Sequence, residues 1–166
     1  MEILAFVLST LGLISVTSAS LIKGKKMGLI LFLVCCGNFL YATSYVIDGS
    51  GINGAASCYL GGVLAIVNYL FDARGKTVPK WLAAIYALAF IVINVIFGTE
   101  VIPTLLAILA TMCFVLSIGM PSGTKYRIWT CVNLLLWITF DIVTQTYSTL
   151  YAHIIQLTCT VVGMFI

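Results

Sequence analysis

Two asparagines, Asn38 and Asn133, lie inside apolar runs of the chain, VCCGNFLYATSYVID and TCVNLLLWITFDIVT. An amide in such a run needs a hydrogen-bond partner, either on a neighbouring helix or on a bound molecule. At helical spacing each asparagine shares a face with aromatic side chains. These faces carry Asn38, Tyr41 and Tyr45 in one run and Asn133 and Trp137 in the other, and a third run adds Gln156. Amides beside aromatic rings are typical of a pocket that hydrogen-bonds and stacks a small polar solute.

Asp141 and His153 are the strongly ionisable pair expected within the apolar runs. Each lies a few residues below the same expected surface, so the pair is an ion pair that closes an outer gate, a proton relay, or two groups at a wet rim. Histidine changes charge near neutral pH, so a proton relay remains one of the alternatives. The six cysteines show no CxxC or Cys/His ligand spacing, and one Asp with one His supplies no clear catalytic set. The sequence therefore predicts no metal, no cofactor and no enzyme.

The composition is that of a chain solvated mainly by lipid, with 62% hydrophobic and 8% charged residues against roughly a quarter charged in soluble domains. A helix needs about 20 residues to cross the hydrocarbon layer, and the charges and the Gly, Pro and Ser clusters leave seven such segments. They span residues 3–22, 27–47, 51–71, 80–98, 101–118, 126–147 and 149–166. The first is expected to be a retained helix, because Glu2 precedes it and lysines follow it, the reverse of a signal peptide. The predicted fold class is an all-α membrane protein, a single membrane domain with seven transmembrane helices.

All eight Lys and Arg residues fall in the first, third and fifth connections between these segments. The positive-inside rule then predicts an N-terminus outside and a C-terminus in the cytoplasm. Because topology accounts for the net charge of +3, no nucleic-acid partner is expected. The expected partners are the lipid bilayer and a small polar solute, with a homo-oligomer or a membrane partner left open.

A shift of 95 residues, the separation of Asn38 and Asn133, superimposes the first three segments on the last three in the same orientation. The matched pairs are Gly28 and Gly123, Cys36 and Cys131, Asn38 and Asn133, Leu40 and Leu135, and Ile47 and Ile142. Residues 80–98 remain as a linker helix between the two halves. The pattern predicts two parallel three-helix units, residues 3–71 and 101–166, related by an axis along the membrane normal.

With three helices, a linker helix and three more, and with almost no loops, the chain resembles the SWEET and PQ-loop transporters and the nicotinamide-riboside carriers. The order of GINGAAS, GGVLAIVNYL, IPTLLAILAT and RIWTCVNLLLWITFD resembles more closely the YgjV-type family of bacterial inner-membrane proteins. The first resemblance implies solute transport, and the second implies a bacterial inner membrane. The chain lacks the Pro-Gln pairs of the SWEET pattern and has one transmembrane proline, Pro103, so neither sugar specificity nor a proline hinge follows.

Small residues on other faces predict close helix packing, with Gly12 on the first segment and Gly61 and Ala65 on the third. Two tight three-helix units of this kind would rock against each other as rigid bodies. The sequence thus favours a facilitator or secondary carrier that moves a sugar, a nucleoside or a vitamin-like solute by alternating access. The alternative is a non-transporting subunit that binds a solute or a partner within a larger membrane complex.

Overall fold

The structure is a computed structural model that describes residues 2–22, 27–49, 51–120 and 123–165. These residues form seven helices: α1 (Glu2–Leu21), α2 (Met27–Asp48), α3 (Ile52–Ala73), α4 (Lys80–Phe97), α5 (Val101–Ile118), α6 (Gly123–Thr144) and α7 (Tyr147–Phe165). Each of the seven is long and apolar enough to cross a membrane. The prediction of an all-α protein with seven helices able to span a membrane is therefore confirmed for the part of the chain that the structure describes.

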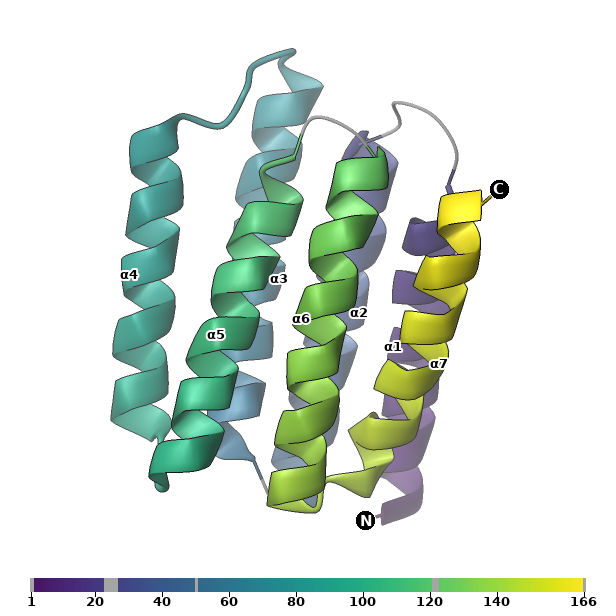
Figure 1. Cartoon of the computed structure of the whole chain (residues 1–166), viewed down its shortest axis with the longest axis vertical. Helices are drawn as coiled ribbons and strands as arrows, with labels where there is room; N and C mark the ends of the chain where they lie inside the picture. The colour runs from purple at the N-terminus through teal and green to yellow at the C-terminus, as the bar shows by residue number, and fades with distance from the viewer. Residues whose placement is uncertain (1, 23–26, 50, 121–122, 166) are drawn as a thin grey trace.

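The helices form two facing layers in which the chain runs alternately up and down (Figure 1). One layer contains α1, α2 and α3, and the other contains α5, α6 and α7. Within each layer the helices pack in chain order, and the layers meet where α1 packs on α7 and α3 packs on α5. Helix α4 lies outside this pair of layers, against α3 and α5. Most of its surface faces outward, because only 17% of its span is buried.

The last turns of α1, α3 and α5 and the first turns of α2, α4 and α6 lie at the end of the bundle where the C-terminus lies, and the N-terminus lies at the other end (Figure 1). All Lys and Arg residues of the described ranges belong to the first of these ends, namely Arg74, Lys76, Lys80, Lys125 and Arg127. We call it the cation end, and we call the opposite one the N-terminal end. The charge asymmetry seen in the sequence is therefore also an asymmetry of the folded bundle.

The turn between α6 and α7 lies earlier in the chain than the sequence predicts. Helix α6 begins at Gly123 and ends at Thr144, not at residues 126 and 147. It ends because Gln145 adopts a left-handed backbone conformation, with a φ of 56°, and Thr146 N donates to Asp141 O over 2.9 Å. The YST stretch, which was expected to be the turn, forms the first turn of α7 instead.

Small residues lie where side chains of the first layer approach one another closely. A Cβ atom at Gly12 would lie 3.2 Å from the Tyr41 ring, and one at Gly61 would lie 3.1 Å from Asn38 Oδ1. Ala65 is fully buried beside Val34 and Tyr126. These close approaches bring the ring of Tyr41 and the amide of Asn38 into the space between the layers.

Candidate solute site

An internal cavity of about 50 Å³ lies between the two layers. All seven helices contribute to its wall, and the part formed by α6 runs from Tyr126 near the cation end to Trp137. A buried water needs roughly 10 to 15 Å³ of such space, so the cavity has room for a few water molecules. The residues predicted from sequence that line it are Asn38, Tyr41, Asn133, Trp137, His153 and Gln156, together with Gly61.

The two asparagines each use the amide nitrogen to hold the fold. Asn38 Nδ2 donates to Val34 O of its own helix over 2.8 Å, and Asn133 Nδ2 donates to Ala110 O of α5 over 2.7 Å. Neither carbonyl oxygen, Oδ1, accepts a hydrogen bond from a described residue. Each asparagine therefore combines a structural donor with an acceptor that remains available in the cavity wall.

Gln156 differs from the asparagines because its side-chain amide has no hydrogen-bond partner among the described residues. The residue is 7% exposed and lines the cavity from α7. A buried amide normally finds partners, since leaving it unpaired costs free energy. Gln156 thus supplies both a donor and an acceptor that nothing in the described chain occupies.

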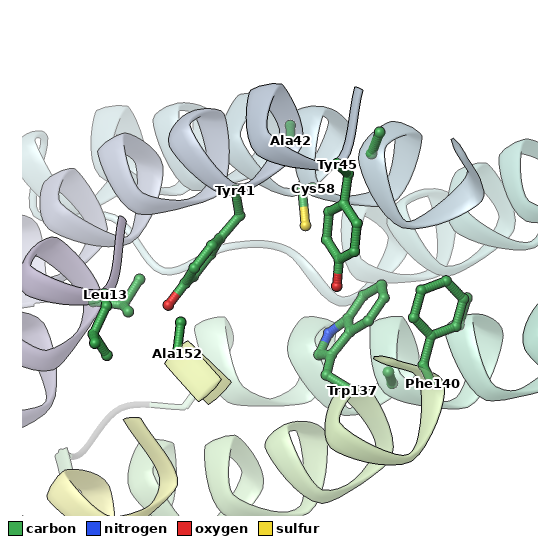
Figure 2. Close-up of a cluster of buried hydrophobic side chains, with 12 residues drawn as sticks. Leu13, Tyr41, Ala42, Tyr45, Cys58, Trp137, Phe140 and Ala152 are labelled. Carbon is green, nitrogen blue, oxygen red and sulfur yellow. The ribbon is translucent and has the colours of Figure 1, made fainter. Parts of the chain in front are cut away.

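The aromatic side chains expected beside the asparagines take two different places. Tyr41 and Trp137 form part of the cavity wall, but Tyr45 is not among the residues that line it. Figure 2 shows Tyr45 reaching from α2 toward Trp137 and Phe140 on α6. Its ring centroid lies 6.3 Å from that of Trp137 and 6.2 Å from that of Phe140. Tyr45 therefore closes the space between the layers on the side of the N-terminal end.

Asp141 is the centre of a buried polar cluster at this closure. Its Oδ1 accepts hydrogen bonds from Tyr45 Oη at 2.6 Å and from Thr149 Oγ1 at 3.0 Å, and its Oδ2 lies 2.6 Å from His153 Nδ1. Asp141 is 0% and His153 4% exposed, which does not fit two groups at a wet rim. The cluster joins α2, α6 and α7 across the two layers. We call Tyr45, Phe140, Asp141, Thr149 and His153 the N-terminal seal.

His153 also sits between two aromatic rings. Its ring centroid lies 5.1 Å from that of Tyr41 and 6.2 Å from that of Trp137, and it is stacked on the latter at an interplanar angle of 22°. These contacts fix the imidazole so that one nitrogen points to Asp141 while the ring contributes to the cavity wall. The cavity and the acidic cluster are therefore connected by a single side chain.

A second closure lies at the cation end and depends on Arg127, which lies in the first turn of the predicted sixth segment and near the start of α6. Arg127 Nε donates to Ser20 O over 2.9 Å, and its Nη2 donates to Ile22 O over 3.0 Å. A cationic side chain on the last carbonyls of a helix satisfies acceptors that the helix itself leaves unpaired. Beside it, Tyr126 packs with Ala19 and Ile30. We call Arg127 with its two carbonyl partners, together with Tyr126, the cation-end seal.

Sequence reasoning missed the partner of Arg127, because nothing in the local pattern distinguishes it from the other cations of the connections. It also missed two polar pairs that tie α4 to α3. Tyr86 Oη donates to Asn68 Oδ1 over 3.1 Å, and Ser57 Oγ donates to Asn94 Oδ1 over 3.1 Å. Both are helix-to-helix bonds of the kind that membrane proteins use for packing.

The described residues contain no group of three or more His, Cys, Asp or Glu side chains that could hold a metal ion. The six cysteines are free thiols, and each is buried or partly buried. The chemistry that the described cavity offers is hydrogen bonding, stacking and proton transfer at one imidazole.

Comparison of the chain with protein-family models, with curated proteins and with solved structures finds no match in any of the three.

Proposed function

We propose that the protein is a facilitator or secondary carrier that moves a small, uncharged polar solute across a membrane by alternating access. The observation that carries this proposal is the cavity between the layers, which lies between two sets of contacts that cross from one layer to the other. At about 50 Å³ the cavity admits a few water molecules, so binding a larger solute would require the two layers to move apart. Opening either seal would expose the solute to one side of the membrane.

The arrangement of helices supports two moving units. In the proposed repeat, α1 to α3 form one unit, α5 to α7 form the other, and α4 is the linker. Neighbouring helices pack in the same order in both units, and the α1–α7 contact has its counterpart in the α3–α5 contact. Asn38 and Asn133, which the 95-residue shift pairs, both line the cavity from the middle helix of their unit. This placement is what a twofold axis along the membrane normal would produce.

The two seals give the rocking motion a physical basis. The N-terminal seal joins α2 to α6 and α7, and the cation-end seal joins α1 to α6, so both cross the boundary between the proposed units. Opening one seal while the other stays closed would give alternating access. By the positive-inside rule, the cation end would face the cytoplasm of a bacterial cell, and the N-terminal end would face outward.

The wall of the cavity indicates the chemistry of the solute. It offers two asparagine carbonyl oxygens and a complete glutamine amide beside the rings of Tyr41 and Trp137. These groups match hydroxyls, amides and ring nitrogens of an uncharged molecule. The Lys and Arg side chains of the described ranges belong to the cation end, so no fixed cation in that part of the chain is available for an anionic solute.

Gln156→Leu is the sharpest test of the site, because it removes cavity polarity without breaking any hydrogen bond between described side chains. The matched control is Thr158→Val on the exposed face of α7, where the hydroxyl bonds only Ile154 O of its own helix. A thermal-shift screen of sugars, nucleosides and vitamin-like molecules should find a solute that stabilises the wild type and the control. The stabilisation should be lost in Gln156→Leu.

The same solute should then enter liposomes that contain the purified protein alone. A solute that stabilises Gln156→Leu as much as the wild type would show that the cavity is not the binding site. Binding without uptake would contradict the carrier and favour a solute-binding subunit.

A further inference from the structure

His153, the one histidine of the chain, connects two different environments. Its Nδ1 lies 2.6 Å from Asp141 Oδ2, and its ring forms part of the cavity wall. No described residue forms a hydrogen bond with its Nε2. This nitrogen is also absent from the set of fully buried, unpaired side-chain atoms of the described residues. One imidazole therefore links a buried carboxylate to the space in which a solute would bind.

The buried carboxylate needs a compensating charge. An isolated carboxylate away from water is costly unless a cation or a proton neutralises it. The hydroxyls of Tyr45 and Thr149 donate to Oδ1, but they bring no charge. Among the described residues, His153 is the cation-forming side chain that contacts Asp141, since the Lys and Arg side chains belong to the cation end.

The other titratable groups around the pair are neutral in their ordinary form. Tyr41 and Tyr45 on α2 and Cys58 on α3 face Asp141, and Tyr151 on α7 lies near Tyr41. In the described ranges, α1 and α5 contribute apolar Leu13, Val16, Ala107 and Ala110 to the same cluster. Phenols and thiols are largely uncharged at neutral pH. One proton, held or released by His153, therefore decides the net charge of this region.

We infer that the carrier is proton-coupled and that His153 Nε2 is its proton site, an inference that rests on the function proposed above. From the open side, a hydronium ion transfers one proton to Nε2 and leaves as water, and the resulting imidazolium is balanced by the Asp141 carboxylate. On the other side, Nε2 returns the proton to water and the imidazole becomes neutral again. Neutral Nε2 accepts a hydrogen bond and protonated Nε2 donates one, so the two states bind the same solute differently. Such a difference in binding is what coupling requires.

The first experiment needs no solute. Because the chain has one histidine, ¹⁵N-histidine labelling of the full protein in lipid nanodiscs reports on His153 alone. As the pH is raised, Nε2 should pass from protonated to unprotonated while Nδ1 stays hydrogen-bonded to Asp141. Asp141→Asn should lose the strongly deshielded Nδ1 proton signal that a carboxylate partner produces. An imidazole that keeps one protonation state throughout would overturn the inference.

The second experiment measures coupling in liposomes that contain the purified protein. They are offered a mixture of uncharged sugars and nucleosides, read by mass spectrometry, with and without a pH gradient. A gradient of about one pH unit would support up to about tenfold accumulation in a cycle that moves one proton per solute. The wild type and Thr158→Val should accumulate a component of the mixture, whereas Asp141→Asn should lose accumulation.

The outcomes separate the two proposals. Uptake that only equilibrates, whatever the gradient, would overturn proton coupling and leave the carrier intact. If no component enters, the carrier proposal fails, and the titration of His153 alone decides whether the pair is a proton site.

Discussion

At the residue scale, Asn38 and Asn133 divide their side-chain amides between the fold and the cavity wall. The nitrogen of Asn133 binds Ala110 O on α5, and its oxygen remains in the cavity wall. A sequence can show that burying such an amide without a partner costs free energy, and helical spacing can show which aromatic rings share its face. It cannot show which backbone carbonyl lies within reach, because that depends on the neighbouring helix. The sequence therefore left packing and binding as alternatives, and the structure shows a packing bond for each amide nitrogen and places each asparagine in the cavity wall.

The Asp141–His153 contact predicts that the effect of Asp141→Asn on the free energy of unfolding changes sign when His153 is replaced by leucine. His153→Leu should lower the free energy of unfolding by about 3 to 5 kcal/mol, because it leaves Asp141 buried without a positive partner. Asp141→Asn should destabilise the wild type, but it should stabilise the His153→Leu variant by removing the uncompensated charge. Unfolding of the four proteins in mixed micelles measures this cycle. If the losses of unfolding free energy in the two single variants simply add in the double variant, the two side chains are not energetically coupled.

At the element scale, the helix ends explain where sequence reasoning succeeded and where it failed. Apolar length and flanking charges place six of the seven helices to within two residues at each end, since a span through lipid requires both. The α6–α7 turn was misplaced because Gln145, a residue without a turn preference, takes the left-handed conformation. The role of Arg127 was missed because its carbonyl partners lie at the end of α1 and just after it, more than 100 residues earlier.

The cap that Arg127 places on α1 should contribute measurably to stability. Arg127→Gln removes a two-pronged, charged donor from the carbonyls of Ser20 and Ile22, and hydrogen bonds of this kind contribute about 1.5 to 3 kcal/mol. Thermal unfolding in detergent should show a clearly lower midpoint temperature for Arg127→Gln than for the wild type. Lys80→Gln is the matched control, because it removes the same charge at the same end of the bundle, where Lys80 is exposed. Equal losses in both variants would mean that net charge, not the cap, stabilises the protein.

At the scale of the whole molecule, the proposed rocking of two units predicts that a cross-link between the units blocks solute uptake, whereas a cross-link within one unit does not. Ser9 and Ser44 join α1 to α2 within one unit, with their Oγ atoms 2.7 Å apart. Ser20 and Thr160 join α1 to α7 across the boundary, with Oγ and Oγ1 3.1 Å apart. Both pairs place side-chain tips at a separation that a disulfide replaces with little movement.

In a background without the native cysteines, Ser9→Cys/Ser44→Cys should therefore keep solute uptake after oxidation. Ser20→Cys/Thr160→Cys should lose uptake on oxidation and regain it on reduction. Uptake in liposomes measures both. Undiminished uptake by the oxidised boundary pair would show that α1 and α7 need not separate at the cation end, contrary to the rocking model.

The helix lengths given above also imply that the hydrophobic thickness of the protein is uneven around its perimeter. Helices α4 and α5 have 18 residues each, or about 27 Å at 1.5 Å per residue, whereas α2, α3 and α6 have 22, or about 33 Å. Because α4 and α5 lie side by side, the two shortest helices form one edge of the bundle, and α7 and α1, with 19 and 20 residues, lie at the opposite edge (Figure 1). A bilayer that matches the long helices must thin along the edge of α4 and α5 or tilt the molecule. We therefore expect short-chain lipids to gather beside α4 and α5, which fluorescence quenching by brominated lipids at Trp81 of α4 would detect.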